Sequence, residues 1–124
     1  MSGRPLVAVI DDDESVRESL PDLLRELGFD AEAFSSAPAF LESDCLSRAD
    51  GLIVDIAMPK MTGFELQRRL KQAGSRTPIV FITAHADAAT SARALAEGAV
   101  ACLFKPFSPA ALQEALQRAI AKNQ

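Results

Sequence analysis

A chain of 124 residues with 48% hydrophobic and 24% charged residues has the size and composition of one folded globular domain, not of a disordered segment. Its 13 basic and 17 acidic residues give a net charge of −4, which argues against direct binding to nucleic acid or to an acidic membrane surface. It contains no apolar run near the roughly 20 residues of a membrane span and no signal peptide, and Cys45 and Cys102 lie far apart like reduced thiols of a cytoplasmic protein.

The first predicted strand is Leu6–Ile10, an all-apolar run that is typical of a strand buried on both faces of a parallel sheet. Leucines at helical spacing then predict an amphipathic helix, with Asp13 as its N-cap and Gly28 just beyond its end. Pro21 lies inside this helix, where it removes a backbone hydrogen bond. We therefore predict a kink near Pro21.

The middle of the chain continues the alternation of strand and helix. Residues 29–34 alternate apolar and acidic side chains, as a half-exposed edge strand does. A short helix is predicted over residues 36–45, then a buried strand over residues 52–55 and a helix over residues 62–74. Another apolar strand is predicted to end on Thr83.

The last third of the chain adds a helix rich in alanine over residues 87–97, in which Leu95 is the only large apolar residue. Because alanine buries little area, this helix should be the one least tied to the core. A strand over residues 99–104 and a helix that starts at Ser108 and Pro109 complete the pattern. Five strand–helix repeats predict an α/β, flavodoxin-like (βα)5 three-layer sandwich with a parallel sheet in the order 2-1-3-4-5.

Acidic residues follow two strands that are neighbours in this order, Asp11 and Asp12 after the first and Asp55 at the end of the third. Their carboxylates should converge at the carboxyl edge of the sheet, where they repel one another unless a cation is present. Oxygen ligands of this kind point to Mg²⁺ or Mn²⁺. Thr83 and Lys105 end two further strands on the same edge, so a hydroxyl and an ammonium complete a site for a phosphoryl group.

At this point the chain resembles the receiver domain of two-component response regulators, and most closely the branch whose members carry a helix-turn-helix output domain. The resemblance covers almost the whole chain. The stretches that carry it are residues 9–14, 53–63, 81–84 and 103–107.

The resemblance implies that Asp55 accepts a phosphoryl group from the phosphohistidine of a histidine kinase. It implies that Mg²⁺ is bound directly by Asp12, by Asp55 and by the backbone carbonyl of Ala57, and through water by Asp11. Transfer of this kind relies mainly on positioning and on neutralisation of charge.

The resemblance also implies that Lys105 contacts the phosphoryl oxygens, that Thr83 moves to hydrogen-bond one of them, and that the Lys105–Pro106 peptide bond is cis. Side chains at Ala57 and His85 would tune the hydrolysis of the phosphoryl group. Family members usually form homodimers through the surface made here by residues 87–97, by residues 99–104 and by the last helix.

One departure from the family concerns Cys102, which stands where most members have an aromatic residue that couples to the threonine. We expect signalling to rely instead on a shift of the helix that carries Leu95, with Thr83 as trigger. Phe104 shares a strand face with Cys102 and either replaces the missing bulk, marks a contact surface or packs beneath that helix.

The sequence admits three other interpretations. The spacing of Asp11, Asp13 and Ser15 resembles the signature of haloacid-dehalogenase phosphatases, in which Asp11 would be the nucleophile. A second alternative is a receiver-like interaction module that is never phosphorylated. A flavin-binding module is disfavoured because no Gly/Ser/Thr-rich phosphate loop follows the first strand. The sequence leaves open the cognate kinase, the output, the oligomeric state and whether this is a stand-alone regulator or part of a longer one.

Overall fold

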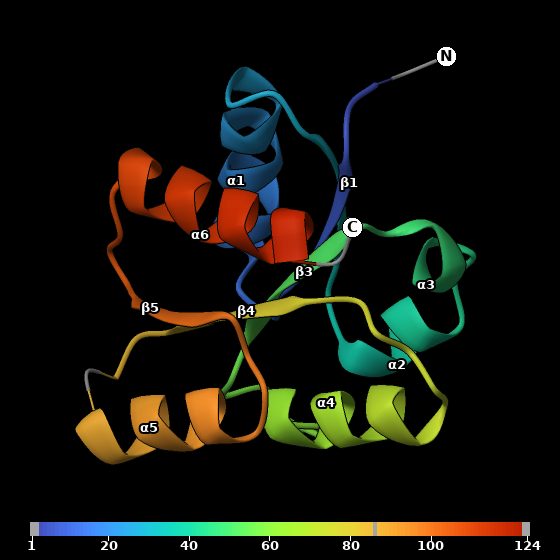
Figure 1. Ribbon diagram of the computed structural model, residues 1–124, viewed down its shortest axis with the longest axis vertical. Coiled ribbons are helices and arrows are strands. Elements are labelled where there is room, and N and C mark those ends of the chain that lie inside the picture. The colour runs from blue at the N-terminus through green and yellow to red at the C-terminus, as the bar shows by residue number, and fades with distance from the viewer. Residues whose placement is uncertain (1–2, 86, 123–124) are drawn as a thin grey trace.

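The protein is described by a computed structural model that covers residues 3–85 and 87–122 (Figure 1). The elements in chain order are β1 Leu6–Ile10, α1 Glu14–Glu26, β2 Asp30–Phe34, α2 Ala37–Leu41, α3 Cys45–Arg48, β3 Gly51–Asp55, α4 Gly63–Gln72, β4 Ile79–Thr83, α5 Ala88–Ala96, β5 Ala101–Phe104 and α6 Pro109–Lys122. The strands pair in parallel in the order β2-β1-β3-β4-β5, which confirms the predicted topology. Within the described residues, no helix is both long and apolar enough to cross a membrane.

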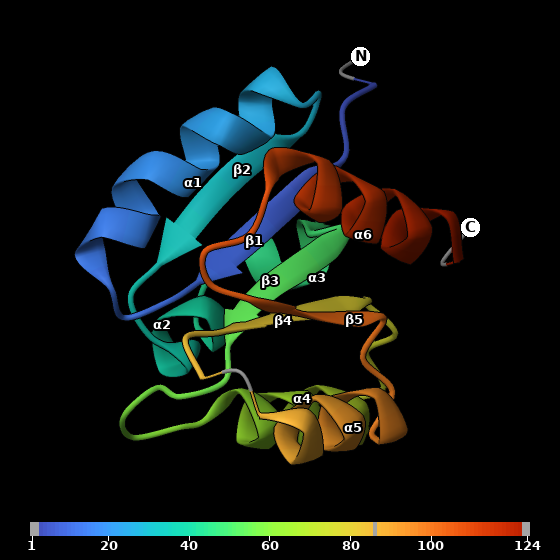
Figure 2. The same ribbon diagram turned by 90° about the vertical axis from the view of Figure 1, so that its left-hand side faces the viewer.

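The sheet is the middle layer of three. Helices α1 and α6 cover one face, and α2, α3, α4 and α5 cover the other (Figures 1 and 2). Successive side chains of a strand point to opposite faces, so β1 sends Val7 and Val9 into the core under α1 and α6, and Ala8 and Ile10 into the other core. The all-apolar strands predicted from the sequence are therefore buried on both faces.

The predicted ends of α1 are confirmed. The Asp13 side chain caps the helix by accepting a hydrogen bond from the backbone N–H of Ser15 at 3.0 Å. Gly28 follows the helix with a φ of +102°, a conformation that residues with a Cβ adopt at a cost. Pro21 lies within α1, which runs from Glu14 to Glu26, and the kink near it stays a prediction.

The single helix predicted over residues 36–45 is wrong, because two short helices, α2 and α3, occupy residues 37–48. Ser36 caps α2 as expected. The break comes at Ser43, whose hydroxyl and backbone N–H both donate to the carbonyl of Phe40, at 2.7 and 3.0 Å. A serine that bonds back to the preceding turn in this way competes with continuation of the helix.

The last strand begins later than residue 99, because β5 starts at Ala101. Ala99 still belongs to the end of α5, where its N–H donates to the carbonyl of Ala94 at 3.0 Å after the left-handed turn at Gly98. Ala94 is the buried residue of α5, and Leu95 is 50% exposed. Ala94 therefore anchors α5 in the core, and the expectation that α5 is the helix least tied to the core stays a prediction.

Candidate functional site

The predicted site residues meet at the carboxyl edge of the sheet. Asp11 directly follows β1, and Asp55 and Thr83 are the last residues of β3 and β4. Lys105 directly follows β5. The parallel register aligns these strand ends, because Ile10 lies opposite Val54 on β3 and Thr83 lies opposite Phe104 on β5.

Three carboxylates face one another there. Asp11, Asp12 and Asp55 each present an oxygen atom, and the three atoms lie within 4.8 Å of one another. Asp11 and Asp55 are buried, whereas Asp12 is exposed. The predicted convergence of the acids is therefore a property of the structure.

Lys105 reaches into the same cluster. Its Nζ lies 2.9 Å from Oδ2 of Asp11 and 3.8 Å from Oδ2 of Asp55. The peptide bond from Lys105 to Pro106 is cis, as expected. The ammonium partly balances the carboxylates, and it lies closer to Asp11 than to Asp55.

Backbone groups hold the acids in place. The N–H of Ala57 donates to Oδ1 of Asp55 at 3.1 Å, and the N–H of Asp13 donates to Oδ1 of Asp11 at 3.0 Å. Sequence reasoning missed Arg17, whose guanidinium donates to the carbonyl of Asp11 at 3.0 Å. An arginine one turn into the helix after an acidic run is the signal that could have pointed to this contact.

Gly63 is a second residue that sequence reasoning passed over as a site component. A Cβ at this position would lie 3.0 Å from the carbonyl oxygen of Asp55, 3.0 Å from Cα of Ile56 and 2.9 Å from the ring of Phe81. Its N–H donates to the carbonyl of Ile56 at 3.0 Å. The start of α4 can approach Asp55 this closely only because residue 63 has no side chain.

Thr83 is buried at the end of β4, and its hydroxyl oxygen accepts a hydrogen bond from the N–H of His85 at 3.1 Å. The N–H of Lys105 donates to the carbonyl of Thr83 at 2.7 Å. Ala57 and His85 are exposed at this edge of the sheet, in the loops after β3 and β4. The loop after β4 is thus linked to the loop that carries the lysine.

Burial and the repulsion between carboxylates shift the pKa values of the cluster. Burial, followed by the negative charge of Asp11, raises the pKa of Asp55 to about 6. Burial disfavours the charged form of Lys105, but its hydrogen bond with Asp11 and the charge of Asp55 outweigh this effect and raise the pKa of the lysine. The carboxylates therefore carry more negative charge than one ammonium relieves.

This donor set fits a divalent cation. Carboxylate and carbonyl oxygens are the hard ligands that Mg²⁺ and Mn²⁺ prefer, and one exposed acid beside two buried ones leaves an approach from solvent. Asp11, Asp12 and Asp55 are the residues that could hold such an ion.

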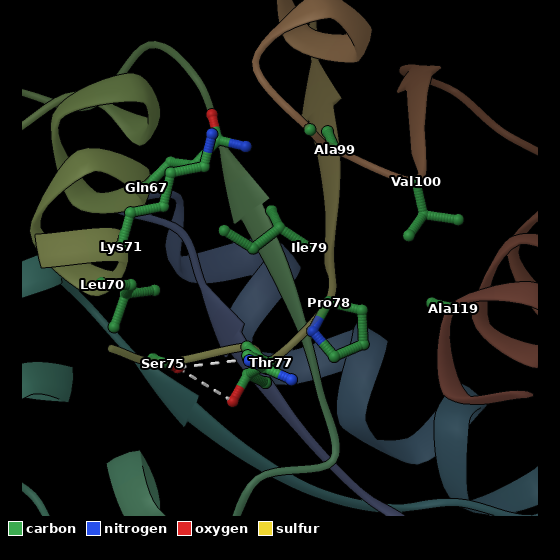
Figure 3. Close-up of a pocket in the computed structure, with 12 residues that line it drawn as sticks. Gln67, Leu70, Lys71, Ser75, Thr77, Pro78, Ile79, Ala99, Val100 and Ala119 are labelled. Carbon is green, nitrogen blue, oxygen red and sulfur yellow. Dashed lines mark hydrogen bonds between the residues drawn. The ribbon is translucent and has the colours of Figure 1, made fainter. Parts of the chain in front are cut away.

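One pocket of the structure adjoins the site, and another lies at the opposite edge of the sheet. An apolar pocket of about 370 Å³ adjoins the site, between α1 and the residues after β5. Its lining includes Val16, Leu20, Leu23, Lys105 and Phe107. A separate pocket of about 260 Å³ lies where β4 and β5 begin, lined in part by Gln67, Lys71, Thr77 and Ala99 (Figure 3). The second pocket is at the opposite edge of the sheet and takes no part in the acidic cluster.

Comparison with known proteins identifies the family. A family model described as "Response regulator receiver domain" matches residues 7–117. The chain belongs to the response regulator receiver domain family. The match to the phosphatase signature at Asp11 is overturned as an assignment of family, because the receiver match covers nearly the whole chain.

Individual relatives agree with this family. The chain is 39% identical to the response regulator protein TodT of Pseudomonas putida over 115 residues, which are 93% of this chain and 51% of TodT. It is 38% identical to the transcriptional regulatory protein FixJ of Rhizobium meliloti over 113 residues, 91% of this chain and 55% of FixJ. The structure of the response regulator StyR superposes with a TM-score of 0.88 at 44% identity, covering 98% of this chain and 61% of StyR. The chain spans about half the length of the curated relatives it matches.

Cys102 packs against the core under α4 and α5. Phe104 is 38% exposed, and whether it compensates for the missing aromatic ring at position 102 stays a prediction. Leu95 on α5 is the other large apolar side chain that is exposed among the described residues. Both cysteines are free, and burial together with a hydrogen bond to Glu32 raises the pKa of the Cys45 thiol to about 12, which makes it unreactive.

Proposed function

We propose that residues 1–124 form a single receiver domain that acts in the cytoplasm and accepts a phosphoryl group on Asp55 from a histidine kinase. The observation that supports this most directly is the convergence of three carboxylates and the ammonium of Lys105 at one strand edge, in a chain of this family. An acyl phosphate on Asp55 would change the contacts of the neighbouring side chains at the strand ends, Asp11, Thr83 and Lys105.

In the proposed reaction, an oxygen of the Asp55 carboxylate forms a bond to phosphorus while the N–P bond to the kinase imidazole breaks. The electrons of that bond stay on the ring nitrogen, and the product on Asp55 is an acyl phosphate. The N–H of Ala57 holds one carboxylate oxygen of Asp55, which leaves Oδ2, on the side of Lys105, for the attack. Catalysis here is mainly positioning and charge compensation.

Asp12, Asp55 and the carbonyl of Ala57 would hold Mg²⁺ directly, and Asp11 would hold it through water. The ion, when bound, supplies positive charge for the phosphoryl oxygens. Lys105 would exchange its contact with Asp11 for one with a phosphoryl oxygen, and its raised pKa keeps it charged at neutral pH. The receiver thereby promotes its own phosphorylation and dephosphorylation without acting on another substrate.

Thr83 would turn its hydroxyl toward the phosphoryl group and release the N–H of His85, which frees the loop before α5. The resulting change would reach the surface formed by α5, β5 and α6, where Leu95 and Phe104 are exposed. We infer that this surface mediates homodimer formation in the phosphorylated state, and that the domain itself contacts neither nucleic acid nor membrane. The apolar pocket between α1 and Phe107 offers the kinase a docking surface beside Lys105.

The test is incubation with acetyl phosphate and Mg²⁺, followed by intact mass and peptide mapping, with Asp55→Asn as control. Addition of one phosphoryl group to Asp55, absent from the variant and from samples with EDTA, is the expected result. Phosphate on Asp11 would favour phosphatase chemistry instead. No incorporation from either acetyl phosphate or a phosphorylated kinase would favour an interaction module that works without phosphate.

A further inference from the structure

Helix α5 is fastened to α4 at its C-terminal end. Glu97, the C-cap, pairs through its carboxylate with Arg93 at 2.8 Å and with Arg68 of α4 at 3.7 Å. The carbonyl of Glu97 accepts a hydrogen bond from Nε2 of Gln67 at 3.0 Å and another from Nζ of Lys71. Figure 3 shows these two side chains of α4 extending to the same place. Residue 97 is therefore a fixed point for α5.

The N-terminal end of α5 has no comparable attachment among the bonds described for residues 87–90. Asp87 caps the helix by accepting from the N–H of Ala89 at 2.9 Å and from the hydroxyl of Thr90 at 3.1 Å, and both partners belong to the helix itself. This end follows the loop that starts at Thr83. A disturbance at Thr83 would therefore displace the N-terminal end of α5, while its C-terminal end stays attached to α4 at Glu97.

Arg93 lies one turn before Glu97 and makes a further contact with α4. Its guanidinium carbon is 4.0 Å from the ring centroid of Phe64, in the first turn of α4. Phe64 is itself buried and packs against Phe81 with ring centroids 5.3 Å apart. The Phe64 ring therefore rests on Phe81, which lies two residues before Thr83 on β4, and Phe64 directly follows Gly63, where an added Cβ would lie 3.0 Å from the carbonyl oxygen of Asp55.

We propose that Arg93 is a positioning residue that holds α5 against α4 in the unphosphorylated protein through its stacking on Phe64, with its guanidinium oriented by the ion pair to Glu97 at the end of the same helix. The inference rests on the proposed function, because holding the helix matters for signalling only if phosphorylation of Asp55 shifts it.

The effect of Arg93 follows from linkage. A contact made only in the resting position of α5 opposes the shifted position, so removing it increases the population of the shifted helix. The Arg93 side chain is 52% exposed, and stacking and pairing at such a site are modest. We expect the equilibrium to change about three- to tenfold.

The first arm of the test uses hydrogen–deuterium exchange in the Asp55→Asn background, which cannot be phosphorylated at that residue. Arg93→Ala is expected to speed exchange of the amides of residues 88–96 about three- to tenfold, while the amides of β1 stay unchanged. Arg93→Lys keeps the charge but loses the planar stacking group, and its amide exchange in residues 88–96 should be faster than in the parent and slower than in Arg93→Ala. Arg69→Ala is the matched control, since this exposed arginine of α4 forms no hydrogen bond or ion pair through its side chain with the described residues. Exchange in Arg93→Ala equal to that of its parent, or equally faster in β1, would overturn the proposal.

The second arm restores Asp55 and measures phosphorylation by acetyl phosphate with Mg²⁺. Arg93→Ala is expected to accumulate phosphoprotein about three- to tenfold faster than the wild type, and Arg69→Ala at the wild-type rate. Equal rates despite faster exchange of α5 would show that the contact is not coupled to Asp55. If the wild type itself takes up no phosphate, the proposed function fails, and the exchange measurement still decides whether Arg93 holds the helix.

Discussion

The ammonium of Lys105 lies 2.9 Å from Oδ2 of Asp11, and this bond joins residues 94 positions apart in the chain. Asp11 is fully buried, and the lysine side chain is 22% exposed. The pair closes the carboxyl edge of the sheet between β1 and β5, on either side of Asp55. In the resting protein, the ammonium of Lys105 is thus the cationic partner of the buried Asp11 carboxylate.

Lys105→Met should destabilise the protein as well as abolish phosphorylation, because it leaves the buried charge of Asp11 without its cation. We expect a loss of about 2–4 kcal/mol in the free energy of unfolding, below the upper range for fully buried pairs because the lysine is partly exposed. Urea denaturation at pH 7 without metal measures it. Lys105→Arg keeps a cation within reach and should lose less, and equal losses in both variants would argue against the ion pair.

The stability of the metal-free protein should depend on pH through Asp55. Its pKa is about 6 in the folded protein against 3.8 ordinarily, so the folded state binds the proton more tightly between these values. Stability from this group is therefore gained as the pH falls through 6 and is missing at pH 7. Asp55→Asn should be more stable than the wild type by about 1–2 kcal/mol at pH 7.5 in EDTA, and the difference should vanish near pH 4.

Thermal melts of both proteins across this pH range measure the effect. Mg²⁺ should stabilise the wild type at pH 7.5 more than it stabilises Asp55→Asn, because the cation relieves the same repulsion. A constant difference between the two proteins from pH 4 to pH 7.5 would contradict the assignment of the raised pKa to Asp55.

Gly63→Ala should displace the backbone of Asp55. The added Cβ meets the carbonyl oxygen of Asp55, Cα of Ile56 and the ring of Phe81 at 3.0 Å or less. We expect a loss of about 1–3 kcal/mol of stability together with slower phosphorylation. Gly3→Ala, where a Cβ meets nothing within 4 Å, is the control and should leave both quantities unchanged.

His85→Ala should change the lifetime of the phosphorylated state by a few fold without changing stability. The His85 side chain is exposed beside the site, while its N–H is the group that occupies the Thr83 hydroxyl. The decay of phosphoprotein after removal of acetyl phosphate measures the lifetime. A decay rate equal to that of the wild type would remove the His85 side chain from the mechanism.

Phe104→Ala should weaken the phosphorylated dimer and cost the monomer less stability than truncation of a fully buried ring, because the Phe104 side chain is 38% exposed. Phe34→Ala is the contrasting variant, since that ring packs edge to face on Phe40 with centroids 5.5 Å apart. It should cost stability without affecting dimerisation. Sedimentation of the phosphorylated proteins reports the association, and an unchanged dimer in Phe104→Ala would place the interface elsewhere.

Local signals in the sequence were sufficient for most of the fold. The caps at Asp13 and Ser36, the turn at Gly28 and the all-apolar strands depend on residues a few positions apart, so pattern alone predicts them. The break at Ser43 was missed because it depends on a side-chain hydrogen bond that competes with the helix. The presence of acids, hydroxyl and lysine at one edge also followed from the alternation of strand and helix.

Which of these groups pair depends on contacts between elements that are far apart in the chain. The Nζ of Lys105 lies about an ångström closer to Asp11 than to Asp55. Phe104 is partly exposed, whereas Cys102 packs against the core. Arg93 of α5 stacks on the ring of Phe64 in α4. Each outcome depends on the twist of the sheet and on how closely helices approach it, which are set by packing across the whole core. Local sequence patterns therefore predict the kind of site, and packing sets the contacts of its side chains in the resting state.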